Sequence, residues 1–257
     1  MTTGALCIVE RNARVYRRVW RGSLFMSFLQ PTLFLLAMGV GLGALVDSGG
    51  SPLPGGVGFL DFLAPGLLAA TCMQTATFES SFPITGKMTW RRNYEAITAT
   101  PMRIADLVLG ELIWIGVRLT TVVVAFAAVI TAFGVPRSPL ALLAVPAALL
   151  TGLAFSALTM AYAATLKSND NFNVVFRFVV TPLFLFSGVF FPLSRLPASL
   201  QTAAWFTPLF HGVELTRGLT LGTLESSAWL AHVAYLVAML ATGFVAALWT
   251  FTRRLRA

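Results

Sequence analysis

Six long apolar runs, separated by short polar segments, constrain this chain more than any other feature. A helix needs roughly 20 apolar residues to cross a bilayer core, and each run has about that length. The charge content agrees, since 11% of the residues are charged, against about 25% in soluble domains. The sequence therefore predicts an all-α polytopic membrane protein, with one transmembrane domain over residues 1–257. We expect its six transmembrane helices at about 23–46, 60–82, 105–133, 140–166, 174–191 and 229–252.

The basic residues lie mainly at the ends of the apolar runs, a pattern of membrane topology and not of nucleic-acid binding. With both termini in the cytoplasm, thirteen basic residues fall inside: five before the first span, four in the segment 83–106, Lys167 and three at the C-terminus. Arg137, Arg195 and Arg217 fall outside. The positive-inside rule therefore predicts a multi-pass protein of the plasma or inner membrane with both termini in the cytoplasm.

The N-terminal segment, residues 5–21, has two different faces when it is drawn as a helix. Its arginines share one face, and several apolar residues share the opposite face. This pattern is typical of a helix that lies in the membrane interface, with its basic face toward anionic headgroups. The alternative is a basic flank that only sets topology. The two faces consist of Arg11, Arg14, Arg18 and Arg21, and of Val9, Ala13, Tyr16 and Trp20.

The polar segment Pro83–Asp106 lies between two spans and faces the cytoplasm in this topology. An apolar edge and a polar rim recur within it at helical spacing, and Pro101 ends the run. The pattern leaves two interpretations open: a docking helix for a soluble partner, or a helix lying on the membrane surface. The apolar edge is Trp90, Tyr94 and Ile97, and the polar rim is Arg91, Arg92 and Glu95.

The segment Pro192–Ser227 is too polar for a span and too apolar for an ordinary loop. It predicts two short amphipathic helices, at 197–206 and 211–221, with an interruption at Pro208. Backbone at membrane depth must be surrounded by protein or water, so we expect this external segment to pack on the bundle.

Three charged residues, Glu79, Glu111 and Arg118, lie within the predicted spans. Such charges are costly in lipid and usually face the bundle interior or a wet cavity. They contact a substrate headgroup, or link the polar segment to the spans, or pair with one another and fix helix packing. Glu214 and Arg217 are predicted to form a local i,i+3 pair.

No catalytic or metal-binding constellation is present in the sequence. The chain has no G-x-x-x-x-G-K-[ST] phosphate loop, G-x-S-x-G or H-E-x-x-H. Cys7 and Cys72 have no metal-ligand spacing, and His211 is interpreted as a cap or turn residue. We therefore expect that the chain is not an enzyme and binds no cofactor itself. A self-contained secondary transporter or channel is one interpretation of such a membrane protein, but it would predict repeated halves, which the sequence does not show.

Three blocks of sequence carry a resemblance to a known family. They are T-A-T-F-E at 75–79, R-R-N-Y-E-A-I-T-A-T-P at 91–101 followed by G-E-L-I-W at 110–114, and T-P-L-F-L-F-S-G-V-F-F-P at 181–192 followed by P-L-F-H at 208–211. The chain resembles the permease subunits of ABC-2 type ATP-binding-cassette exporters over essentially its whole length. It is most similar to the permeases that export nodulation lipo-oligosaccharides, followed by the daunorubicin-type drug export permeases.

The resemblance implies a function that the residues alone do not give. Such permeases have six spans, pair with a second permease copy or paralogue, and dock two cytoplasmic ATPase subunits that hold ATP and Mg. The segment 83–106 would then carry the coupling helix, and Pro208, His211 and Arg217 would belong to the external signature. The cargo would be an amphipathic lipid-linked saccharide, lipid or drug, exported from the cytoplasm or inner leaflet.

The predicted topology can be tested with single cysteines in a chain that lacks Cys7 and Cys72. An impermeant thiol reagent should label the Ser199→Cys variant in intact cells, because the segment 192–227 is predicted to be external. The Thr89→Cys variant should be labelled only after the cells are permeabilised. Labelling of Thr89→Cys from outside intact cells would contradict the topology.

Overall fold

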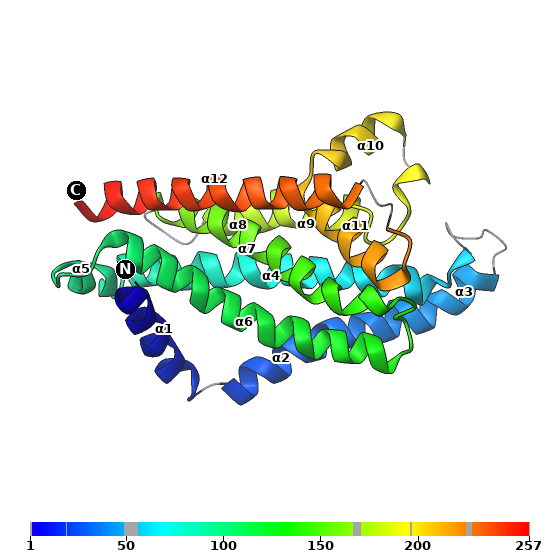
Figure 1. Ribbon diagram of the computed structural model, residues 1–257, viewed down its shortest axis with the longest axis horizontal. Helices are drawn as coiled ribbons and strands as arrows, with labels where there is room; N and C mark the ends of the chain where they lie inside the picture. Colours follow the sequence, from blue (N-terminus) through cyan, green and yellow to red (C-terminus); the bar gives the residue numbers. More distant parts are fainter. Residues whose placement is uncertain are drawn as a thin grey trace.

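The computed structural model describes residues 2–18, 20–48, 56–166, 171–195, 197–224 and 228–256, and within these ranges every regular element is helical. The long helices run side by side in a bundle (Figure 1). Both chain termini and α5 lie at one end of it, here called the terminal end. The elements are α1 (Thr2–Tyr16), α2 (Trp20–Phe34), the π-helix η1 (Leu35–Leu42), α3 (Gly43–Ser48), α4 (Phe59–Thr89), α5 (Asn93–Thr98), α6 (Ile104–Ala132), η3 (Pro139–Leu143), α7 (Ala144–Ala163), α8 (Asn171–Val175), the π-helix η4 (Phe176–Val180), α9 (Thr181–Phe186), η5 (Leu193–Arg195), α10 (Ala198–Trp205), α11 (Pro208–Leu221) and α12 (Ala228–Arg256).

Five helical stretches in the described residues are long and apolar enough to cross a membrane. The prediction of an all-α polytopic membrane protein is thus confirmed. The predicted fifth span corresponds to the apolar but shorter helix Asn171–Phe186, so the structure does not confirm six spans. The five stretches are Leu29–Val46, Phe59–Thr89, Ile104–Ala132, Pro139–Ala163 and Trp229–Arg256.

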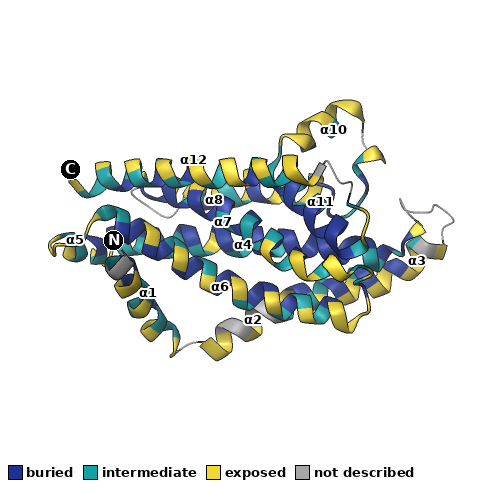
Figure 2. Ribbon diagram, in the orientation of Figure 1, coloured by how far each residue is buried: buried dark blue, intermediate teal, exposed yellow. Residues whose placement is uncertain are grey.

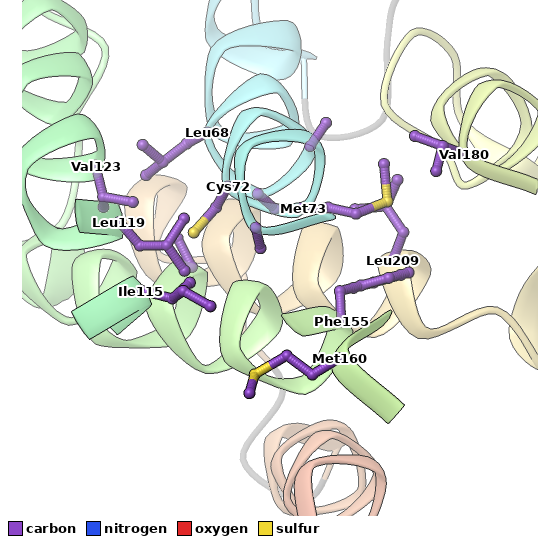
Figure 3. Close-up of a cluster of buried hydrophobic side chains, with 14 of the residues drawn as sticks. Leu68, Cys72, Met73, Ile115, Leu119, Val123, Phe155, Met160, Val180 and Leu209 are labelled. Carbon is purple, nitrogen blue, oxygen red and sulfur yellow. The ribbon is translucent and has the colours of Figure 1, made fainter. Parts of the chain in front are cut away.

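Helix α4 runs through the centre of the bundle and packs against α6, α7 and α11 (Figures 1 and 2). In its most apolar stretch 72% of the residues are buried, against 22% in α12. Small residues allow neighbouring helices to approach closely, which drives helix packing in lipid. At one such contact a Cβ on Gly152 of α7 would lie 2.6 Å from Sγ of Cys72. Cys72 and Met73 of α4 lie among side chains from α6 and α7 in this region (Figure 3).

The segment predicted to leave the membrane at Pro83 remains helical for seven more residues. Helix α4 continues through Pro83 to Thr89 because Ile84, Thr85 and Met88 are buried against the bundle, and this packing outweighs the low helix propensity of proline. The expected docking helix is therefore reduced to the six residues of α5. Trp90 caps α4 and does not share a helix with Tyr94, so their helical spacing was misinterpreted.

The predicted single helix 5–21 is likewise divided. Helix α1 ends at Tyr16, Arg17 and Arg18 form a turn, and α2 begins at Trp20. The chain bends there because α1 packs against α6 while α2 enters the bundle in another direction (Figure 1). Arg18 and Arg21 consequently do not continue the basic face of α1.

At the end opposite the termini, α11 packs on the bundle as expected and contacts α4, α7 and α12. The two predicted short helices are present as α10 and α11, but the break between them lies at residues 206–207, and Pro208 is the first residue of α11. Proline suits this position, because the first residues of a helix have no intrahelical acceptor for their N–H groups. Helix α10, by contrast, is mostly exposed (Figure 2).

Gly110 determines how closely α1 approaches α6. A Cβ at this position would lie 2.7 Å from Cβ of Ile8 and 2.8 Å from the carbonyl oxygen of Ala5, which is backbone and cannot move alone. We expect Gly110→Ala to destabilise the protein by about 1–3 kcal/mol through overpacking, although alanine normally favours a helix.

Gly116→Ala on the same helix is a matched control, because its Cβ would meet Cδ2 of Leu153 at an ordinary 3.5 Å. Thermal unfolding in detergent should show a lower midpoint temperature for Gly110→Ala than for the wild type. The midpoint temperature of Gly116→Ala should not be lowered. Equal midpoints would contradict the close α1–α6 contact.

Candidate functional site

Four polar side chains from four helices meet at the terminal end, and we call them the Glu111 cluster. Tyr94 of α5 donates from its hydroxyl to Oε1 of Glu111 at 3.0 Å. Asn12 of α1 donates from Nδ2 to Oε2 at 3.1 Å. Lys87 of α4 donates from Nζ to both carboxylate oxygens, at 2.8 and 2.7 Å. Glu111 on α6 thus contacts every other member of the cluster.

Burial makes these contacts obligatory. Glu111 is 1% exposed and Tyr94 is 0% exposed. A carboxylate removed from water is costly unless it is paired and hydrogen-bonded, and Lys87 supplies the counter-charge. Burial and the Glu111 carboxylate raise the pKa of Tyr94 well above its usual value, so its hydroxyl keeps the proton that it donates. Its ring contacts Phe251 of α12 at 5.9 Å between centroids.

The predicted docking edge is divided by this geometry. Trp90 is 73% exposed, whereas Tyr94 faces the interior and Ile97 is partly buried. In this conformation Tyr94 offers no surface to a partner, because its packing against Glu111 and Phe251 covers it. The residues Arg91, Arg92 and Glu95 are exposed, and the last two approach each other to 4.0 Å.

A second polar site lies deeper in the bundle, where Glu79 of α4 pairs with Arg118 of α6. Nη2 and Nε of Arg118 donate to Oε1 of Glu79, at 2.6 and 3.3 Å. Two of the charges predicted to lie within spans are therefore paired with each other, and Glu111 is paired elsewhere. The guanidinium of Arg118 also stacks over the ring of Tyr16, 4.3 Å from its centroid.

This ion pair lines a cavity of about 770 Å³ between α2, α4, α6 and the helices η4 and α9. The volume is within the range of roughly 300–1,000 Å³ that is usual for small-molecule sites. The lining combines polar and aromatic side chains. Its residues are Gly22, Gln30, Pro31, Phe34, Leu67, Thr71, Gln74, Thr75, Phe78, Glu79, Arg118, Phe176 and Phe184.

The predicted signature residues hold α11 in place at the opposite end. Arg217 pairs with Glu214 at 3.1 Å, as predicted, and also donates to the carbonyl oxygens of Phe62 at 3.2 Å and Gly188 at 2.7 Å. Burial lowers the pKa of Arg217 to about 10, which leaves it charged at neutral pH. A single buried cation thus joins α11 to α4 and to the turn after α9.

The sequence suggested that His211 is a cap or turn residue, and this is wrong. His211 lies within α11 and is buried. Its Nδ1 is 2.7 Å from Nδ1 of His232 on α12, so one ring donates and the other accepts. Burial and the neighbouring His232 lower the pKa of His211 to about 4. The pair therefore joins α11 to α12 in its uncharged form.

Sequence reasoning missed Asn12, Lys87 and His232. Asn12 lies on the same face of α1 as the buried residues Ala5 and Ile8. A polar residue on the buried face of a helix needs a hydrogen-bond partner, and this was the signal that could have identified it. Lys87 was hidden because the segment around it was interpreted as a loop. The contact between His211 and His232 depends on the packing of α11, which no local pattern encodes.

Comparison with known protein families identifies the family of this chain. The profile of the ABC-2 type transporter family matches residues 5–221. The chain belongs to the ABC-2 type transporter family. The matched region runs from α1 through α11 and includes the Glu111 cluster, the Glu79–Arg118 pair and Arg217. The family resemblance inferred from the sequence blocks is thereby confirmed.

Individual relatives cover most of the chain. Nodulation protein J of Rhizobium leguminosarum bv. trifolii is 35% identical over 217 residues, which is 84% of this chain and 81% of the relative. Nodulation protein J of Rhizobium leguminosarum bv. viciae is 30% identical over 250 residues, 97% of this chain and 94% of the relative. The inner membrane transport permease YadH of Escherichia coli (strain K12) is 23% identical over 204 residues, 76% of this chain and 74% of the relative.

The role of charge in the Glu111 cluster can be measured with two near-isosteric substitutions. Glu111→Gln leaves the Lys87 ammonium without its counter-ion and should cost roughly 3 kcal/mol of unfolding free energy. Tyr94→Phe removes one hydrogen bond and should cost about 1 kcal/mol. Unfolding titrations in mixed micelles would compare the two variants. If Glu111→Gln is no less stable than Tyr94→Phe, the charge pair does not hold the cluster together.

Proposed function

We propose that this chain is the membrane-spanning permease of an ATP-driven exporter in the inner membrane, with both termini cytoplasmic. Family membership supports transport, and the sequence lacks a phosphate loop of its own. ATP and Mg would therefore be held by two separate cytoplasmic ATPase subunits, and a second permease, identical or related, would complete the assembly. In this topology the terminal end of the bundle is the cytoplasmic end.

The ATPase subunits would dock at α5 and the turn before it. The exposed residues there are Trp90, Arg91, Arg92 and Glu95. Protein interfaces commonly have an aromatic side chain at the centre and polar residues around it. The observation that carries the proposal is the hydrogen bond from Tyr94 to Glu111, which joins this surface to a transmembrane helix.

Movement of α5 would reach the membrane through the Glu111 cluster. A buried carboxylate cannot lose its partners without a large electrostatic cost, so α1, α4 and α6 must follow α5 or exchange partners together. Phe251 adds α12 to the same group of helices. Tyr94 is thus assigned a coupling function, inside the permease, and not the contact function that its spacing suggested.

The cargo is proposed to be amphipathic: a lipid-linked saccharide, a lipid or a drug. Such a molecule could leave the inner leaflet beside α1, where Arg14 is exposed on the side away from the buried residues Ile8 and Asn12, while Arg11 is partly buried. The cavity of about 770 Å³ between α2 and α4 is then a place for it inside the bundle.

Docking at α5 can be separated from folding because Trp90 makes little contact with the rest of the chain. Trp90→Ala should weaken association with the ATPase by about 2 kcal/mol or more, the usual cost of truncating a central aromatic. Arg91→Ala should mainly change the association rate and its salt dependence. Binding of the purified ATPase to permease in nanodiscs would measure both effects.

Trp249→Ala on α12 is the matched control, since this tryptophan is also exposed, at 62%. Tyr94→Phe should bind the ATPase normally but show less cargo-stimulated ATP hydrolysis. Wild-type affinity of Trp90→Ala would refute docking at this surface.

A further inference from the structure

We propose that a groove between α7 and α12 binds the phosphate group of an anionic phospholipid, with Arg253 and Arg254 as its donors. This lipid is a resident of the permease and not its cargo, because the groove shares no lining residue with the cavity between α2, α4 and α6. The inference rests on the proposed function only for the leaflet: with the terminal end in the cytoplasm, the lipid belongs to the inner leaflet.

The packing of α7 and α12 creates this groove, here called the α7–α12 groove. The helices touch at Gly243, where a Cβ would lie 2.9 Å from the backbone nitrogen of Leu158. Seven residues further along α12, or about 10 Å, they leave a cavity of about 330 Å³. A water molecule occupies about 30 Å³ in the liquid, so a phosphate group and part of its glycerol fit. The lining residues are Ala164, Thr165, Trp249, Thr250, Arg253 and Arg254.

The two arginines carry charge that the described part of the protein does not balance. Among the described residues, neither Arg253 nor Arg254 pairs with a carboxylate. The buried carboxylate of Glu111 at the same end is occupied by Lys87. A phosphate group accepts strong hydrogen bonds from guanidinium groups and neutralises part of their charge. The groove is therefore complementary to an anionic phosphate.

The lining also leaves the arginine donors available. Cζ of Arg253 lies 5.6 Å from the centroid of the Trp249 ring, one helical turn away. A guanidinium that stacks on a ring keeps the edge with its N–H groups free for other partners. The hydroxyls of Thr165 and Thr250 already donate to carbonyl oxygens of their own segments. The side-chain donors that remain for a ligand are thus the two guanidinium groups and the indole N–H.

Exposed apolar surface leads up to the groove and favours a lipid over a free phosphate ion. On α12, Val245 and Trp249 precede Arg253 at intervals of four residues, which places all three near one face. Val245 is 64% exposed and Trp249 is 62% exposed. On α7, Leu158 and Tyr162 are also exposed and precede the groove. An acyl chain can cover this surface, whereas an inorganic ion cannot.

The length of α12 places the arginines at the level of lipid headgroups. Arg253 follows Trp229, the first residue of this span, by 24 residues, or about 36 Å along the helix. The hydrocarbon core is only about 30 Å thick, and tryptophan is typical of the interface that borders it. Basic pockets between transmembrane helices on the cytoplasmic side are known binding sites for anionic headgroups.

The charges of the groove also select among phospholipids. Within the described part of the chain, no acidic residue lines the groove. The cation of a phosphatidylcholine headgroup would therefore lie beside two arginines with no carboxylate to receive it. Phosphatidylglycerol has a net negative charge and no such cation, so it fits the groove better.

The test measures lipid binding to the purified, delipidated full-length permease by native mass spectrometry in detergent. Phosphatidylglycerol and phosphatidylcholine with the same acyl chains are titrated separately. The first molecule of phosphatidylglycerol should bind at least about tenfold more tightly, because each arginine favours an anionic headgroup. Equal affinities would overturn the inference. Inorganic phosphate should not displace the bound lipid, and displacement at an equal concentration would show a site for a free ion instead.

Two double variants separate this groove from the general positive charge of the terminal end. Arg253→Gln combined with Arg254→Gln should weaken phosphatidylglycerol binding about thirtyfold, which corresponds to roughly 1 kcal/mol per arginine. Arg91→Gln combined with Arg92→Gln is the matched control, because it removes two charges from the same end but none from the lining. An equal loss in both double variants would refute the groove as the site.

A third substitution obstructs the groove and leaves both arginines in place. Thr165 is exposed, so Thr165→Trp can fill the groove without disturbing the core, and it should also weaken phosphatidylglycerol binding. Thr131→Trp is its control, an exposed threonine outside the groove whose hydroxyl likewise donates to its own helix. Wild-type affinity of Thr165→Trp would place the lipid elsewhere. Because no ATPase, ATP or cargo is present, these outcomes do not depend on docking at α5, and either proposal can fail while the other stands.

Discussion

The buried carboxylate of Glu111 is the constraint on which the terminal end of this permease depends. Taking a charge out of water costs several kcal/mol even after relaxation, so the site must supply a counter-charge and hydrogen bonds. Lys87, Tyr94 and Asn12 provide them from three other helices. One carboxylate therefore fixes the relative positions of α1, α4, α5 and α6, and it does so at the surface proposed to receive the ATPase.

Close packing of small residues holds the remainder of the bundle. Apolar side chains gain little from helix association when lipid is equally apolar, so contact geometry has to supply the stability. Gly110 admits α1 against α6, and Gly152 admits α7 against α4. Gly212 does the same for α11, where a Cβ would lie 2.4 Å from Oγ1 of Thr151. Ion pairs add to these close contacts: Lys87–Glu111 and Arg118–Glu79 both join α4 to α6.

The sequence predicts the five long apolar helices of the described residues because hydropathy is a local property. It predicts helix ends poorly, as Pro83 shows, since burial of Ile84 and Met88 keeps α4 helical beyond the proline. Charge partners are also hidden: Glu79 and Arg118 are 39 positions apart, and only the packing of α4 on α6 brings them together. Spacing placed Tyr94 on the same edge as Trp90, but the turn at Arg92, with its left-handed backbone, directs the two rings differently.

The order of synthesis matters for the α1–α6 contact, because α1 is synthesised long before α6. Asn12 leaves the ribosome 99 residues before Glu111, its hydrogen-bond partner, and Ile8 likewise precedes Gly110. Until α6 has been synthesised, α1 lacks the helix against which it mainly packs in the finished bundle. An amphipathic helix in this position is stable at the lipid headgroups, so the nascent chain can keep α1 there until α6 arrives. The two-faced N-terminal segment is thus suited to biogenesis as well as to the finished bundle.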